Sequence, residues 1–109
     1  MLFRSLLSEE GIDLSGVQTL EKQATGQAYI IVDDQGENSI MIHSGANNAF
    51  TPQQVKEHAE VIKASDFVVA QFESTLESTI EAFSIAREAG VKTILNPAPA
   101  LEEDRKSVV

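Results

Sequence analysis

DFVVAQFESTLESTIEAFSIAREAGVKTILNPAPA, residues 66–100, is the stretch that decides the fold. Apolar runs at residues 66–72 and 91–95 are typical of short strands buried on both faces. Between them, Ser74 and Glu77 fit a capping box at the start of a helix that Gly90 ends. A strand, a helix and a strand at this spacing predict a right-handed crossover in a parallel sheet, so the predicted fold class is α/β.

Two polar residues follow the predicted strands, Glu73 after the first and Asn96 at the end of the second. In open α/β sheets, ligands bind at the carboxyl ends of the strands, so Glu73 and Asn96 are candidate ligand-binding residues. From the pattern alone, a simpler interpretation of Glu73 is a solvated acid that the helix dipole favours. From the same pattern, Asn96, which precedes a proline, is better explained as part of a strand stop.

The first half of the chain has a different pattern. In residues 27–33, Ala28, Ile30 and Val32 lie on one face, and Tyr29 and Ile31 lie on the other. Residues 39–43 alternate again after the turn at Gly36, which predicts an antiparallel hairpin with one apolar face. We also expect an N-terminal helix over residues 1–10 and a short strand at residues 17–20. After a loop at residues 44–48, Thr51, Pro52 and Gln54 predict a capped helix that ends near residue 64. The acidic start of residues 101–109 suits a further helix.

Composition excludes several classes of function. The 109 residues carry a formal net charge of −9 and no cysteine. We therefore expect no nucleic-acid partner, no membrane partner, no disulfide and no thiol nucleophile. His43 and His58 have no metal-ligand spacing, so both are expected at the surface, and the Gly45 loop matches no glycine-rich phosphate motif. The expected location is the cytoplasm.

Two longer stretches carry a resemblance to a known family. TGQAYIIVDDQGENSIMIHSGANNAFTP (residues 25–52) and AQFESTLESTIEAFSIAREAGVKTILNPAPA (residues 70–100) resemble ribokinases of the phosphofructokinase-B type sugar kinases. The elements T-G-x-A, G-E-N-S-I, G-A-N, Q-x-E-x-x-L-E and N-P-A-P-A stand in the order and at the spacing of that family. The resemblance corresponds to the middle of a ribokinase. It implies one partial ribokinase-like domain over residues 1–109, with a β lid hairpin region at 17–44 and an α/β portion at 45–109.

The resemblance also implies roles for particular residues. Glu73 matches a glutamate that hydrogen-bonds sugar hydroxyls, which overturns the simpler interpretation of this acid. Ala28, Ile30 and Ile42 match lid residues that pack on the sugar ring, and Asn96 lies beside the site in the matching position. The implied substrates are D-ribose and ATP, giving ribose 5-phosphate and ADP, with Mg²⁺ and possibly K⁺ as cofactors. Pairing of two lids implies a homodimer.

The chain departs from the family pattern where the phosphoryl-transfer groups are expected. It contains no Gly-Gly-Lys-Gly-Ala-Asn, no Asn-x-x-Glu and no Gly-Ala-Gly-Asp. The last of these motifs forms the anion hole and supplies the catalytic base in the family. We therefore expect no catalytic or metal-binding residue here, and an inactive fragment of a longer kinase. The alternative is a non-catalytic sugar-binding or self-association module, and a sugar other than ribose also stays open.

Overall fold

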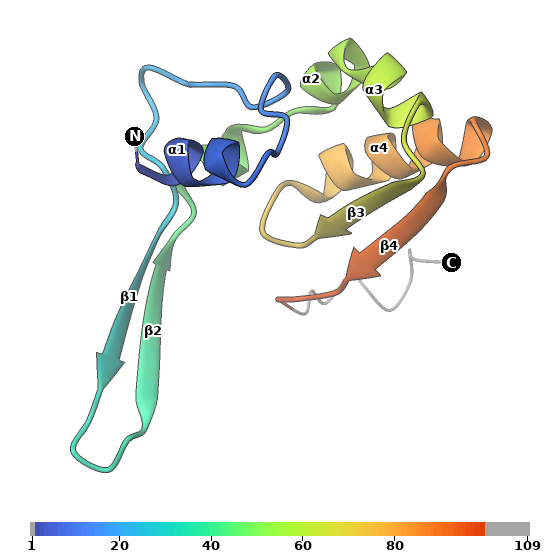
Figure 1. Ribbon diagram of the computed structural model, residues 1–109. Helices are drawn as coiled ribbons and strands as arrows, with labels where there is room; N and C mark the ends of the chain where they lie inside the picture. Colours follow the sequence, from blue (N-terminus) through green and yellow to red (C-terminus); the bar gives the residue numbers. More distant parts are fainter. Residues whose placement is uncertain (1, 100–109) are drawn as a thin grey trace.

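The computed structural model describes residues 2–99. It consists of a projecting β-hairpin and an α/β part (Figure 1). The elements in chain order are α1 (Leu2–Glu9), β1 (Gln27–Val32), β2 (Asn38–His43), the 3₁₀ helix η1 (Gly45–Ala49), α2 (Pro52–Glu57), α3 (Ala59–Lys63), β3 (Phe67–Gln71), α4 (Leu76–Glu88) and β4 (Lys92–Asn96). The predicted helix start in residues 101–109 lies outside the described residues.

The predicted crossover is confirmed, because β3 and β4 are parallel and α4 connects them. Helix α4 packs on both strands and on α2 and α3. Figure 1 shows α4 between the two strands on one side and α2 and α3 on the other. The buried apolar side chains are those of Val55, Phe72 and Ala86. The core of the described residues thus lies between α4 and the elements around it.

Burial of the strands on both faces was a wrong expectation. Val68 and Ala70 are half-buried towards α4, whereas Phe67 and Val69 on the other face are exposed, Val69 by 69%. Strand β4 alternates in the same way, with Ile94 exposed. One helix covers only one face of a sheet, and no described residue covers the other.

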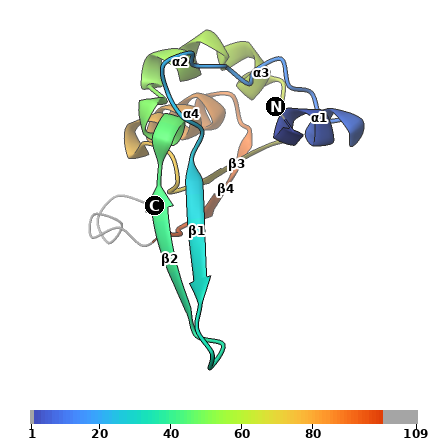
Figure 2. The same cartoon turned by 90° about the vertical axis from the view of Figure 1, so that its left-hand side faces the viewer.

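The hairpin extends away from the α/β part, and it does so in both perpendicular views (Figures 1 and 2). Strands β1 and β2 pair in antiparallel register, with Ala28 opposite Ile42 and Ile30 opposite Ile40. All positions of both strands are exposed. The prediction of a single apolar face was therefore incomplete, because the opposite face also carries apolar side chains, those of Tyr29, Ile31 and Met41.

The helix after residue 51 begins as predicted but is interrupted. Thr51 is the N-cap, and its side chain accepts a hydrogen bond from the Gln54 backbone N–H. In return, the Gln54 side-chain oxygen accepts a hydrogen bond from the Thr51 backbone N–H at 2.8 Å. At His58 the helix breaks into α2 and α3. His58 is half-buried, and its Nε2 atom is buried without a hydrogen-bond partner among the described residues, so the expected surface position holds only in part.

Two further local predictions were wrong. Residues 17–20 form no strand, because the Val17 carbonyl accepts a 2.9 Å hydrogen bond from the Arg4 guanidinium in α1 instead of joining a ladder. The N-cap of α4 is Thr75, one residue later than expected, and no side chain caps that helix. The hydroxyl of Thr75 lies instead 2.7 Å from the carbonyl oxygen of Phe50.

Candidate functional site

Glu73 lies directly beyond β3, at the carboxyl end of the parallel sheet. It is half-buried and lines a cavity of about 260 Å³ between the sheet edge and the root of the hairpin. This volume falls just under the usual range for small-molecule sites, about 300–1,000 Å³. The cavity is lined by Gly26, Gln27, Ala28, Ile42, His43, Ser44, Asn47, Gln71 and Glu73.

The structure brings together three of the five candidate residues. Glu73, Ala28 and Ile42 line the same cavity, Glu73 from the sheet edge and the other two from the hairpin. Ile30 shares a hairpin face with Ala28 and Ile42 but is 63% exposed and lies outside this lining. Asn96 is exposed at the end of β4, opposite Gln71, and lines none of the three cavities around the hairpin root.

Sequence reasoning missed five polar residues that line the same cavity, which are Gln27, His43, Ser44, Asn47 and Gln71. Gln71 could have been found, because it stands in the Q-x-E-x-x-L-E element, two residues before Glu73. His43 follows Ile42 as the last residue of β2. Asn47 stands in the G-A-N element, but residues 44–48 were interpreted as a connecting loop, whereas residues 45–49 form η1.

Close backbone contacts hold the two ends of the hairpin together at its root. The Ala46 backbone N–H donates to the Ala24 carbonyl at 2.8 Å. Gly45 has a φ of +52°, and a Cβ at this residue would lie 2.3 Å from the same carbonyl oxygen. These contacts place η1, and with it Asn47, against the start of β1.

Asn47 connects this cavity to two neighbouring ones. It also lines a cavity of about 320 Å³ along β3 that includes Glu73, and one of about 290 Å³ bounded by Gln18 and Gln54. Asn47 is therefore a lining residue of all three hollows. The polar groups of the three linings are amides, hydroxyls, one imidazole and the Glu73 carboxylate.

This set of groups is suited to binding a neutral polyhydroxylated molecule. The Glu73 carboxylate offers acceptor atoms only, and the amides of Gln71 and Asn47 offer both donors and acceptors. Ala28 and Ile42 add an apolar wall on which the C–H side of a ring can pack. No described residue of the cavity lining is a lysine or arginine that would hold a phosphate.

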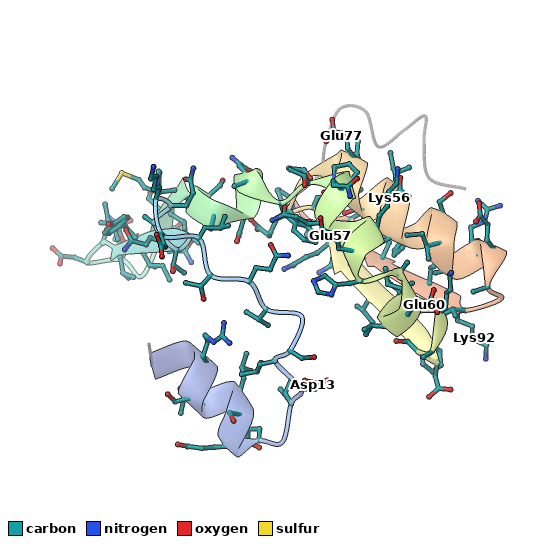
Figure 3. All side chains as sticks on the ribbon, turned by 90° about the horizontal axis from the view of Figure 1, so that it is seen from above. Asp13, Lys56, Glu57, Glu60, Glu77 and Lys92 are labelled. Atoms are coloured by element: carbon teal, nitrogen blue, oxygen red, sulfur yellow. The ribbon has the colours of Figure 1, made fainter. Side chains whose placement is uncertain are left out.

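Two side chains with a shifted pKa, those of Asp13 and Lys63, lie away from this region. The pKa of Asp13 is lowered because the Ser15 backbone N–H donates to its carboxylate at 2.9 Å. The pKa of Lys63 is raised by its hydrogen bond to Glu60. Figure 3 shows Asp13 on the loop after α1, and Glu60 on α3. Neither shift changes the charge of the cavity around Glu73.

Residues 2–99 offer neither a cluster of metal ligands nor a membrane-spanning helix. No group of three His, Asp or Glu side chains in this range could hold a metal ion. None of the described helices is long and apolar enough to cross a membrane.

Comparison with known proteins gives consistent matches. The model of the pfkB family carbohydrate kinases matches residues 2–108. The chain is 50% identical over 93 residues to the bifunctional ribokinase/ribose-5-phosphate isomerase A of Fructilactobacillus sanfranciscensis, covering 85% of this chain and 17% of that protein. It is 45% identical over 89 residues to the ribokinase of Staphylococcus aureus, covering 82% of this chain and 29% of that one.

A solved structure agrees with the sequence matches. The ribokinase from Cryptococcus neoformans var. grubii serotype A in complex with ADP superimposes with a TM-score of 0.77 at 25% identity, covering 95% of this chain and 32% of that one. The chain thus spans about a third or less of the length of these proteins. The match over residues 2–108 and the identity to ribokinases assign it to one family. The chain belongs to the pfkB family of carbohydrate kinases.

Proposed function

We propose that this chain carries the sugar-recognition portion of a ribokinase. The parent enzyme transfers the γ-phosphoryl group of ATP to D-ribose in the cytoplasm, giving ribose 5-phosphate and ADP. The observation that carries the proposal is the cavity in which Glu73 meets Ala28 and Ile42. The identity to ribokinases supports ribose as the sugar.

In this proposal the residues of the chain bind and orient the sugar. The Glu73 carboxylate accepts hydrogen bonds from two sugar hydroxyls, which are stronger than bonds between neutral groups. Ala28 and Ile42 pack on the apolar side of the ring and exclude water from it, and Ile30 joins them when the hairpin lies closer to the sugar. Asn96 contributes from the neighbouring strand end. ATP, Mg²⁺ and K⁺ are held by other parts of the parent enzyme.

Binding of ribose tests the role of Glu73. We expect the 109-residue chain to bind D-ribose weakly, and Glu73→Gln to lower the affinity by roughly ten- to a hundred-fold, because a hydrogen bond to a charged group contributes about 1.5–3 kcal/mol. The measurement is a titration followed by ¹H–¹⁵N NMR spectra. Glu77→Gln is the matched control, since Glu77 is exposed on the first turn of α4 and lines none of the three cavities. Equal affinity of the wild type and Glu73→Gln would contradict the proposal.

A turnover assay tests whether the 109-residue chain lacks the catalytic base and the anion hole. Phosphoryl transfer depends on positioning and on electrostatic stabilisation, and one such donor is worth about 10²–10³ in rate. The chain contains no Gly-Ala-Gly-Asp, so we expect no ribose-dependent ADP formation by the purified 109 residues with Mg-ATP. A coupled assay for ADP measures this. Turnover that Glu73→Gln abolishes would show that a base and an anion hole are present in another form.

A second candidate is a non-catalytic module that associates with itself. The observation in its favour is the exposure of apolar side chains on both faces of the hairpin. It predicts a concentration-dependent sedimentation coefficient and no effect of ribose on the melting temperature. Stabilisation by ribose that disappears in Glu73→Gln would exclude it.

A further inference from the structure

The first turn of α4 departs from the usual capping pattern. An N-cap hydroxyl normally accepts a hydrogen bond from a backbone N–H of the same helix. Here the N-cap Thr75 makes no such bond. Its hydroxyl lies 2.7 Å from the Phe50 carbonyl oxygen and 2.7 Å from the Ser78 hydroxyl, which in turn lies 3.0 Å from the same carbonyl. Both hydroxyls are thus directed to a carbonyl far away in the sequence.

This triangle of contacts is buried at Ser78, half-buried at Thr75 and exposed at Phe50. Ser78 is 1% exposed, and a buried hydroxyl needs a partner. The two hydroxyls supply two protons for three contacts, and the Phe50 carbonyl can accept two bonds. Loss of either hydroxyl removes two of the three contacts. We define Thr75, Ser78 and the Phe50 carbonyl as the clamp.

The clamp connects the two walls of the cavity. Phe50 follows η1 directly, and η1 carries Asn47 at the hairpin root. Thr75 comes two residues after Glu73. On the other side of Glu73, Phe72 is 6% exposed and its backbone N–H donates to the Ala98 carbonyl at 3.1 Å. Glu73 is therefore fixed from both sides, and the clamp fixes it relative to the hairpin root.

We infer that the clamp positions the Glu73 carboxylate against the hairpin wall of the cavity, and that Thr75 and Ser78 are positioning residues for ligand binding. Local rules are broken at functional sites more often than elsewhere, and here a helix leaves its own N–H groups uncapped to make a distant contact. A purely stabilising role would leave the affinity for ligand unchanged. The identity of the ligand as a sugar rests on the proposed function.

Neighbouring threonines on α4 provide a matched experiment. Thr75→Val removes the clamp hydroxyl with little change in shape, and Thr75→Ser retains it. Thr79→Val is the control, because Thr79 lines the cavity along β3 together with Ser78 and is buried as Ser78 is, but its hydroxyl lies outside the clamp and bonds to the Thr75 carbonyl of the same helix. We expect Thr75→Val and Ser78→Ala to weaken D-ribose binding about tenfold, because each removes two of the three clamp contacts, while Thr75→Ser and Thr79→Val bind as the wild type does.

A second measurement needs no sugar. In ¹H–¹⁵N spectra of the free chain, Thr75→Val and Ser78→Ala should shift the amide signals of both Glu73 and Asn47, and Thr79→Val should shift neither. If the wild type binds no ribose, the proposed function fails, and these signals alone decide the inference. Equal effects of Thr75→Val and Thr79→Val on affinity or on the two amide signals would overturn it, as would unchanged signals in Ser78→Ala.

Discussion

A side chain at Gly45 has no room and the wrong backbone conformation. Its φ of +52° is unfavourable for L residues, and an added Cβ would lie 2.3 Å from the Ala24 carbonyl oxygen. Strain of this kind costs about 1–3 kcal/mol, and overpacking adds a similar amount. We expect Gly45→Ala to lower the free energy of unfolding by about 2–4 kcal/mol, measured by urea denaturation and followed at the amide signals of the hairpin.

Gly36 provides the control for this prediction. It also has a positive φ, +84°, but an added Cβ there would meet no atom within 4 Å. Gly36→Ala should therefore cost only the backbone strain, about 1–2 kcal/mol. Equal losses in the two variants would show that the Ala24 contact contributes nothing, and the root of the hairpin would then be looser than the structure indicates.

The candidate site shows how far single residues can be predicted. Glu73 was found because it ends a strand and because a motif surrounds it. Gln71 stands in the same motif, two residues before Glu73. His43 and Asn47 line the cavity because η1 folds the hairpin root against the sheet edge. That arrangement is a property of distant contacts, so no local pattern contained it.

At the scale of elements, the predicted strands and helices are those with a strong local signal. Alternation predicted β1 and β2, and apolar runs around a helical stretch predicted β3, α4 and β4. The capping box of α2 was also predicted, because Thr51 and Gln54 satisfy each other over three residues. Each of these elements is specified by residues that are close in the sequence.

The local predictions that were wrong concern residues whose contacts are distant in the sequence. The N-cap of α4 is Thr75 and not Ser74 as predicted, and the Thr75 hydroxyl bonds to a carbonyl 25 residues earlier. Residues 17–20 stayed irregular because Arg4 bonds to the Val17 carbonyl across 13 residues. The break at His58 contains neither glycine nor proline, and α2 and α3 both pack on α4. Propensity cannot anticipate such contacts, since tertiary packing overrides it.

At the scale of the whole molecule, the described residues are more open than a compact domain. Their radius of gyration is 16.0 Å, whereas a compact domain of about this length has about 13 Å. The difference reflects the hairpin, which projects from the α/β part (Figure 2). Three apolar surfaces are left exposed among the described residues. One is the hairpin face with Tyr29, Ile31 and Met41, the second is the hairpin face with Ile30, Ile40 and Ile42, and the third is the sheet face with Phe67, Val69 and Ile94.

The proposed homodimer through the hairpin predicts which of these surfaces a second copy covers. Ala28 and Ile42 line the cavity, which leaves the face of Tyr29, Ile31 and Met41 for a partner. Ile31 is 55% exposed, and a charge buried without a counter-ion costs several kcal/mol. We expect Ile31→Lys to make the chain monomeric in sedimentation velocity experiments at concentrations where the wild type self-associates.

Val69→Lys separates the hairpin from the sheet face as the contact surface. Val69 is 69% exposed on the sheet, so this substitution introduces the same charge on the apolar face of β3 and β4. Association that survives in Val69→Lys and is lost in Ile31→Lys would support the hairpin dimer. The reverse result would contradict it, because the copies would then meet through the uncovered face of β3 and β4. In that case neither face of the hairpin would be covered by a second copy.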